Sequence, residues 1–519
     1  MAWKSAFTIT GRRAIPLAVA LIVLGGFSAA AAAGATTNAP LRTLSELVAK
    51  LSSQATQPHL RQAALGVKIV ALDSGRVIFE HEPFALRKPA SNNKLFTGAL
   101  ALDRFGSDFR IRTSVFAAGL PDADGVVAGD VVIYGRGDFS MAARFNDGDY
   151  SKALVPMLDA FAKAGVKRIT GALIGDDSFF RTPPYGSSWT TDDLQYYYGA
   201  GVSALTLQDN VIDLVAKAGA NVGDPLVLTL KPETSFLSFS NRAVTVAKGG
   251  KSAVELYRPL GQNIVYVHGS LPVGTSTSDA ATLSNPALFF VTQLKAALAA
   301  RGITVDQAPR SMGSLDRDVA PLNPNWKEIA FMMSKPMGEL VKGMMKPSQN
   351  LYAQLLLLQA GRRRLREDSP LLTTENLGGQ DLRAFLAGVG IKSTDIHLEE
   401  GSGLSRTALV TPDAVVALLR HMATHPQSKA FIDALPVGGV DGTLRSRFKG
   451  TAAERNLTAK TGSLSYVASL SGYVTTAGKE RVAFSLLLNN YSSWPGKPSG
   501  REIIDGMAVT LAEYAGKLE

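Results

Sequence analysis

The sequence predicts an α+β protein in which an antiparallel sheet is flanked by helices and a large β-rich region is inserted. Strand patterns stand at both ends of the chain with helical patterns between them, and residues 109–318 change to short β-rich runs between Gly, Asp and Pro turns. Because the helices must bury their apolar faces, we expect one sheet built from both termini. With 519 residues, 46% of them hydrophobic, the chain is long enough for two or three cored domains.

The first part of the predicted main domain covers residues 40–108. Residues 65–81 alternate and turn at Asp73-Ser74-Gly75, which predicts a hairpin of two strands. A helix follows from Ser91, with apolar residues at helical spacing until Gly106. The same domain is expected to resume at residues 325–519.

The region between these two parts, residues 109–324, is predicted to be the insertion. Within it, residues from about 210 to 274 are almost purely strand and turn, which indicates a nested β module. A helix is expected over 286–300.

The last part of the chain returns to helices and then to strands. Residues 351–358 are strongly apolar and are expected to lie in a buried helix. Three strands and a final amphipathic helix are predicted over 457–461, 466–475, 481–489 and 501–518.

Composition excludes several classes of function. The chain has 54 basic and 44 acidic residues, and its one tight basic cluster, Arg362-Arg363-Arg364-Leu365-Arg366, is expected to cap the end of a helix, not to bind nucleic acid. Without cysteine there is no disulfide, thiol nucleophile or thiolate metal site. His421 and His425 stand four apart without an acid between them, so we interpret them as surface residues and expect no metal and no cofactor.

The N-terminus, residues 1–33, predicts a secretory signal peptide. Three basic residues precede an apolar run over 14–27, which gives way to small residues. The run is shorter than the roughly 20 residues of a membrane span, so an uncleaved anchor is the lesser alternative and at most peripheral membrane contact is expected. Arg12-Arg13 leaves twin-arginine export open beside the general route. Export of a cysteine-free chain favours the bacterial periplasm.

The first of three short motifs is Ser91-Asn92-Asn93-Lys94 at the start of a helix. Its spacing puts the serine hydroxyl and the lysine amine on one face, so a desolvated lysine could take the serine proton. The alternative is a capping serine with a solvated lysine. A second match, Ser446-Arg447-Phe448-Lys449, lies in a turn-like segment where both groups would be solvated.

The other two motifs are Ser348-Gln349-Asn350, between two helices, and Lys460-Thr461-Gly462, on a strand. The first could present a hydroxyl and an amide together, or could be another helix cap. In the second, Lys460 and Thr461 could bind a substrate carboxylate, and Gly462 lets a ligand backbone approach. A backbone N–H beyond Gly462 would pair with that of Ser91 as an oxyanion hole. Alternatively, the strand merely turns at Gly462.

The three motifs in this order are typical of penicillin-binding proteins and serine β-lactamases. The chain resembles the D-alanyl-D-alanine carboxypeptidase/endopeptidase family of class C, low-molecular-mass penicillin-binding proteins over essentially its whole mature length. The 257 positions that separate Ser91 from Ser348 suit this family, whose members carry an inserted region there. Further family-like stretches lie at 89–91, 176–180, 401–406 and 439–444. The resemblance implies a penicillin-binding-protein/serine β-lactamase-like fold.

The resemblance also implies roles for the residues of the motifs. Ser91 would be the acylated nucleophile and Lys94 its base. Ser348 would pass the proton to the leaving amine, and Asn350 would orient the substrate amide. The remaining members act on the substrate: Lys460 and Thr461 would hold the terminal D-alanine carboxylate, Gly462 would admit the substrate backbone, and Ser463 would supply the second oxyanion-hole N–H.

A pocket for the side chain of the third peptide residue is implied as well. By position it would be lined by Asp177, Leu404, Arg406, Leu464 and Ser465. Asp176 and Asp138 are the alternatives to Asp177.

The function that the resemblance implies is a serine D-Ala-D-Ala carboxypeptidase, and possibly a DD-endopeptidase, acting on peptidoglycan stem peptides and acylated by β-lactams. A serine β-lactamase is the first alternative, although no E-x-x-x-N element stands where it would activate a deacylating water. An inactive cell-wall-binding protein of the same fold is the second. The sequence leaves open which peptidase activity dominates, which third residue is preferred and which oligomer forms.

Overall fold

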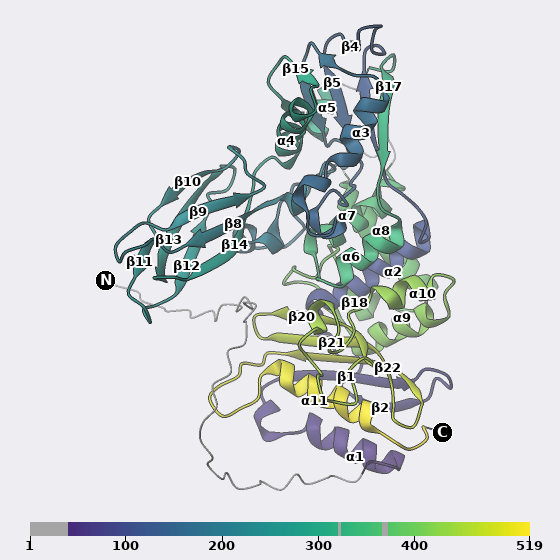
Figure 1. Cartoon of the computed structure of the whole chain (residues 1–519). Helices are drawn as coiled ribbons and strands as arrows, with labels where there is room; N and C mark the ends of the chain where they lie inside the picture. The colour runs from purple at the N-terminus through teal and green to yellow at the C-terminus, as the bar shows by residue number, and fades with distance from the viewer. Residues whose placement is uncertain (1–39, 320–322, 366–371, 519) are drawn as a thin grey trace.

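The computed structural model describes residues 40–319, 323–365 and 372–518, so the predicted signal peptide lies outside the described residues. The main sheet has five antiparallel strands in the order β2-β1-β22-β21-β20. Its central pairing joins the two ends of the chain, with Val67 opposite Leu486. The sheet built from both termini is thus present as predicted (Figure 1). The strands are β1 (Ala64–Ala71), β2 (Val77–His81), β20 (Thr458–Leu464), β21 (Val467–Thr475) and β22 (Arg481–Asn489).

One face of this sheet is covered by α1 (Leu44–Ala55) and α11 (Gly500–Glu513) (Figure 1). Capping boxes start both helices, and their apolar residues share one core with the sheet. The prediction of α11 through residue 518 was too long. After Glu513 the chain leaves the helix, because Tyr514 turns into the core and the Ala515 N–H donates to Leu41 O.

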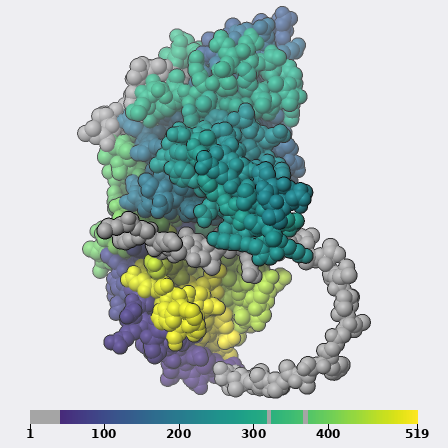
Figure 2. Space-filling view, turned by 90° about the vertical axis from the view of Figure 1, so that its left-hand side faces the viewer, coloured from purple at the N-terminus to yellow at the C-terminus, as the bar shows by residue number. Residues whose placement is uncertain are grey.

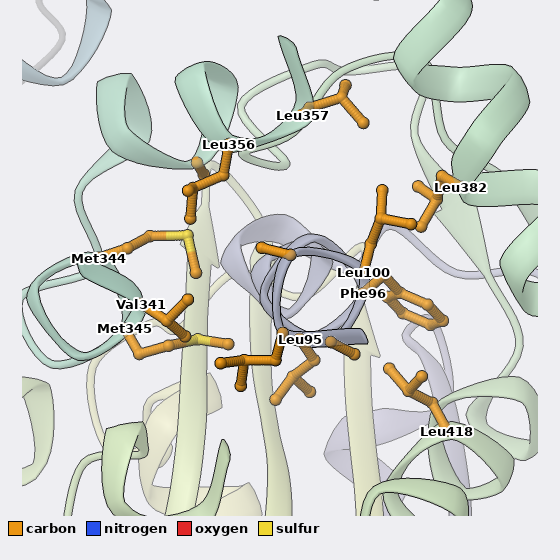
Figure 3. Close-up of a cluster of buried hydrophobic side chains, with 14 of the residues drawn as sticks. Leu95, Phe96, Leu100, Val341, Met344, Met345, Leu356, Leu357, Leu382 and Leu418 are labelled. Carbon is orange, nitrogen blue, oxygen red and sulfur yellow. The ribbon is translucent and has the colours of Figure 1, made fainter. Parts of the chain in front are cut away.

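The other face is covered by a helical layer with α2 (Asn93–Phe105) at its centre. Figure 3 shows α2 end on, with apolar side chains of neighbouring helices around it. Leu95, Phe96 and Leu100 are fully buried, as expected of a helix that is apolar on most of its circumference. The surrounding helices are α6 (Met337–Met345), α7 (Asn350–Arg362), α8 (Thr374–Gly388), α9 (Pro412–Thr424) and α10 (Ser428–Ala434).

The described part of the basic cluster, residues 362–365, ends a helix, as predicted, while Arg366 lies outside the described residues. Arg362, the last residue of α7, lies over the Phe179 ring, and Arg363 lies over the Phe105 ring. Arg364 pairs with Asp381 of α8 at 3.0 Å. These arginines therefore join α7 to its neighbours.

The chain leaves the helical layer through β3 and returns through β17, and these two strands pair with Ala117 opposite Lys327. They belong to a second five-stranded sheet, in the order β16-β7-β5-β3-β17, covered by α3 (Val155–Lys163) and α4 (Pro286–Ala300). The predicted domain boundaries, between residues 108 and 109 and between residues 324 and 325, stay predictions. The strands are β3 (Arg112–Ala117), β5 (Val131–Tyr134), β7 (Leu173–Asp176), β16 (Arg310–Met312) and β17 (Lys327–Met333), and a small sheet beside them holds β4 (Val126–Val127), β6 (Arg168–Ile169) and β15 (Thr304–Val305).

The region of the predicted nested β module consists of strands β8 to β14 in two small sheets. β14 pairs with β8 along its whole length, so strand pairing continues to Thr282, beyond residue 274. In Figure 1 these strands lie to the left of the rest of the molecule, and in Figure 2 their part of the surface faces the viewer, while the first and last described residues pack together at the lower end. The strands are β8 (Val211–Lys217), β9 (Val227–Lys231), β10 (Ser238–Asn241), β11 (Val244–Val246), β12 (Ala253–Tyr257), β13 (Ile264–Pro272) and β14 (Ser276–Thr282).

No described helix combines the length and the apolar character needed to cross a membrane.

Candidate active site

Ser91 lies on a short 3₁₀ turn, η2 (Ala90–Asn92), that leads directly into α2. Ser91 is not the capping residue of either helix, since Pro89 and Asn92 hold those positions, and its hydroxyl instead contacts Lys94 Nζ. Ser91 is half-buried, while Asn92, Asn93 and Lys94 are fully buried. The hydroxyl is therefore the accessible group of a motif that is otherwise inside the protein.

Lys94 is surrounded by three acceptors. Its Nζ lies 2.8 Å from Ser91 Oγ, 2.6 Å from Asn350 Oδ1 and 2.7 Å from Ser402 O. Burial disfavours the ammonium and lowers the pKa of Lys94 to about 7, while the Glu400 carboxylate opposes this shift. Near neutral pH a large share of this amine is therefore unprotonated.

Ser348 stands on the connection between α6 and α7, as predicted, whereas Asn350 is already the first residue of α7. Ser348 has a φ of 67°, a left-handed conformation that is unusual for a residue other than glycine. Asn350 spans the site, because its Oδ1 accepts from Lys94 while its Nδ2 donates to Tyr198 O at 2.9 Å. The side chain of Asn350 therefore has a fixed orientation, with its oxygen toward the lysine.

Lys460 and Thr461 stand on β20, the edge strand of the main sheet. Lys460 is fully buried and its Nζ donates to Ser348 Oγ at 2.8 Å and to Thr461 O at 2.9 Å. Burial, and secondly the charge of Lys94, hold the pKa of Lys460 well below its ordinary value. The three motifs thus meet in one site, in which Lys94 contacts Ser91 and Lys460 contacts Ser348.

Three contacts hold β20 and the neighbouring β21 against the turn of Ser91. Asn92 Nδ2 donates to Lys460 O at 3.1 Å and to Ser469 Oγ at 2.9 Å, and Ser469 Oγ donates to Pro89 O at 2.7 Å. A Cβ at Gly462 would lie 2.9 Å from Ser91 N, so only glycine allows this approach. The backbone of Gly462 therefore runs close to the Ser91 N–H.

Glu400 supports the site through the turn that holds Ser402, and sequence reasoning did not identify it. The buried carboxylate accepts from Ser402 N at 2.7 Å, Ser402 Oγ at 2.6 Å and Gly403 N at 2.5 Å. It also accepts from Trp189 Nε1 at 3.2 Å. These bonds orient the turn whose Ser402 carbonyl contacts Lys94, so Glu400 positions one of the acceptors of Lys94.

The predicted side-chain pocket is only partly brought together by the described contacts. Arg406 pairs with Asp193 at 3.2 Å, and that carboxylate is almost fully buried. Asp177 instead accepts from Ser203 Oγ at 2.8 Å, and burial raises its pKa to about 6. Asp193 was missed because 213 positions separate it from Arg406. Leu404 is buried.

On β20 and the turn after it, Leu464 is half-buried and Ser463 and Ser465 are exposed. The two alternatives to Asp177 are fully or almost fully buried: Asp176 ends β7, and the Oδ1 of Asp138 accepts from both N and Oγ of Ser140 at 2.7 Å. Among the residues that the structure describes, no group of three or more His, Asp or Glu is placed to hold a metal ion.

Comparison with solved structures identifies the fold. The chain is similar to the crystal structure of penicillin binding protein 4 (dacB) from Haemophilus influenzae, with a TM-score of 0.73 and 23% sequence identity over 90% of this chain and 97% of that one. The same protein complexed with a novel β-lactam matches with a TM-score of 0.67. The predicted penicillin-binding-protein/serine β-lactamase-like fold is confirmed. The fold therefore places the chain in the class of penicillin-binding-protein/serine β-lactamase-like proteins.

The chain belongs to the D-Ala-D-Ala carboxypeptidase 3 (S13) family, whose model matches residues 47–514. It is 33% identical over 487 residues to a D-alanyl-D-alanine carboxypeptidase of Actinomadura sp. (strain R39), which covers 91% of this chain and 86% of that protein. It is 26% identical to D-alanyl-D-alanine carboxypeptidase DacB of Haemophilus influenzae, over 85% of this chain and 88% of the relative. The predicted family and enzyme class, a serine-type D-Ala-D-Ala carboxypeptidase, are confirmed.

Proposed function

We propose that this enzyme removes the terminal D-alanine of peptidoglycan stem peptides through an acyl-enzyme on Ser91. The observation that carries the proposal is the 2.8 Å contact between Ser91 Oγ and the buried Lys94 Nζ, whose pKa is about 7. A neutral amine has two hydrogens and one lone pair. Asn350 Oδ1 and Ser402 O accept the two hydrogens, which leaves the lone pair for the Ser91 hydroxyl.

Acylation then follows from the positions of these groups. Lys94 takes the hydroxyl proton as Ser91 Oγ forms a bond to the carbonyl carbon of the penultimate D-alanine. The backbone N–H groups of Ser91 and Ser463 hold the oxyanion. As the peptide bond breaks, the proton passes through Ser348 to the leaving amine of the terminal D-alanine. Water then attacks the acyl-enzyme and releases the shortened peptide.

The terminal carboxylate is the group that Lys460 and Thr461 bind in this proposal. In the free enzyme Lys460 is buried beside Lys94, and no carboxylate is among its hydrogen-bond partners in the described residues. An incoming carboxylate favours the charged form of Lys460. Binding energy is therefore concentrated at the terminus that a carboxypeptidase must recognise.

We further propose that Arg406 and Asp193 read the side chain of the third peptide residue, with Leu404, Leu464 and Ser465 lining the pocket. The support is the ion pair between the two charged groups, whose arginine stays about one-third exposed. The role of Asp177 stays a prediction. Because this pocket lies away from the scissile bond, we expect it to determine which stem peptides are bound.

The cellular setting is the bacterial periplasm in this proposal, supported by the predicted signal peptide over 1–33. There the enzyme meets stem peptides, their crosslinks and β-lactam antibiotics. Acylation by β-lactams is supported by the solved structure of the Haemophilus influenzae protein with a β-lactam.

Two measurements test the proposal together. Incubation with benzylpenicillin should add one drug mass to the intact protein, and peptide mapping should find it on Ser91. A stem pentapeptide should lose one D-alanine. Rapid turnover of the drug without a lasting adduct would favour a β-lactamase, and no adduct at all would favour an inactive binding protein.

A further inference from the structure

The segment before β20 partly covers the edge of the main sheet. Val437 pairs with Thr458 in an antiparallel bridge, Ala459 N donates to Pro436 O and Gly438 N donates to Leu457 O, both at 2.9 Å. β20 is the last strand in the sheet order, so this short segment borders only its beginning. The chain then turns over residues 439–444, one of the family-like stretches to which the proposed function assigns no role.

This turn, which includes η9 (Gly442–Leu444), is fastened to Lys346, two residues before Ser348. Lys346 Nζ donates to Asp441 Oδ2 at 2.7 Å and to Leu435 O at 2.6 Å, while Lys346 O accepts from Thr443 N at 3.0 Å. Gly442 has a φ of 54° and packs directly on Lys346 O, where a Cβ would clash. Backbone and side-chain contacts thus place Thr443 at a defined point.

That point is beside the predicted carboxylate site. Thr461 Oγ1 donates to Thr443 Oγ1 at 2.7 Å. Thr461 is buried, whereas Thr443 is half-buried. Without a substrate, the hydroxyl of Thr461 is therefore directed at Thr443. A hydroxyl can donate only one hydrogen bond, so Thr461 cannot serve a carboxylate and Thr443 at once.

We propose that Thr443 is a positioning residue for recognition of the terminal carboxylate, acting through Thr461. When the carboxylate arrives, the Thr461 hydroxyl turns to it, and the Thr443 hydroxyl reverses and donates to Thr461 Oγ1. Thr461 keeps a partner in both states, and its oxygen stays in place. Because a hydroxyl that accepts a hydrogen bond is a stronger donor, Thr443 strengthens the bond to the carboxylate. This inference rests on the proposed function, since it assumes that Thr461 binds that group.

The test compares two probes on the full-length enzyme: benzylpenicillin, which carries a carboxylate, and its methyl ester, which does not. Thr443→Val keeps the shape of the side chain and removes the hydroxyl. It should slow acylation by the free acid about fivefold, the size expected of one hydrogen bond between uncharged groups, and leave acylation by the ester within about twofold. Thr443→Ser should restore the free-acid rate.

Val440→Ala, an exposed position on the same turn, is the matched control and should change neither rate. Thr443→Ala repeats the test if valine disturbs the turn. Equal slowing of both probes would show that Thr443 only supports the turn, and an unchanged free-acid rate would show that it has no role; either overturns the inference. If the wild-type enzyme is not acylated at Ser91, the proposed function itself fails, and the inference with it.

Discussion

The chain contains the same spacing of serine and lysine twice, in opposite environments. In residues 91–94 the three residues after the serine are fully buried. In residues 446–449 the middle two residues are the anchored ones: Arg447 pairs with Asp505 of α11, and Phe448 packs into the sheet core. The serine and lysine of that second segment are exposed. Spacing alone therefore does not make a catalytic pair.

What distinguishes the first segment comes from elsewhere in the chain. Asn350 and Ser402 stand 256 and 308 positions away from Lys94 and supply its fixed acceptors. The helical layer around α2 removes water, which lowers the pKa of the lysine. A serine–lysine pair becomes a nucleophile and base only where the fold desolvates the amine and occupies its hydrogens.

Replacing each serine gives the largest contrast between the two segments. Ser91→Ala should lower hydrolysis of a stem pentapeptide by a factor of about 10⁴ or more and abolish labelling by benzylpenicillin, because no other group can form the acyl-enzyme. Ser446→Ala should leave both unchanged. The measurements are D-alanine release and intact mass. A drug adduct mapped to Ser446 would reverse the assignment of the two segments.

Replacing the second buried lysine tests whether the first segment depends on β20. Lys460→Met removes the charge that we propose pairs with the substrate carboxylate, which should cost roughly 3 to 5 kcal/mol, or about two to four decades in kcat/KM. Lys449→Met is the control on the exposed segment and should have no effect. Steady-state kinetics with the pentapeptide would measure both. A loss of less than threefold for Lys460→Met would contradict its role.

The pH dependence of acylation tests the desolvation of Lys94. Because its pKa is lowered to about 7, the neutral base prevails above that pH, and the rate should rise about tenfold per unit below pH 7 and level off above it. Glu400→Gln should move the midpoint to lower pH, since the carboxylate raises the pKa of Lys94. Stopped-flow acylation between pH 5 and 10 would measure this. A rise only near pH 10 would mean an ordinary, solvated lysine.

Local patterns predicted the parts of this molecule that depend on near neighbours. The hairpin of β1 and β2, the helix after Ser91 and the strands β20 to β22 follow from alternation, turns and apolar spacing. The end of α11 could not be predicted, because residues after Glu513 are apolar enough for a helix but are held by contacts with the N-terminal segment, including Leu41.

The residues of the site fall into the same two groups, those that local patterns predict and those that depend on distant parts of the chain. The three motifs could be found because each is contiguous, whereas their supports are single residues brought from far along the chain. Glu400 directly precedes the family-like stretch 401–406, and Thr443 lies inside 439–444, so a signal was present for both. For Asp193 we see none, because its partner is 213 positions away and many other acids fit the same description.

The smallest effect is expected in the side-chain pocket, where the structure and the sequence favour different acids. Arg406→Ala and Asp193→Asn should lower kcat/KM about tenfold for a peptide with a charged third residue, because one ion-pair contact is lost, and leave acylation by benzylpenicillin within about twofold. Asp177→Asn is the matched control, since its carboxylate faces Ser203. If Asp177→Asn lost the preference and Asp193→Asn kept it, the earlier prediction would be right and the ion pair with Arg406 would be structural. Equal slowing of both reactions by Arg406→Ala would instead mean that the arginine supports the site and does not read the peptide.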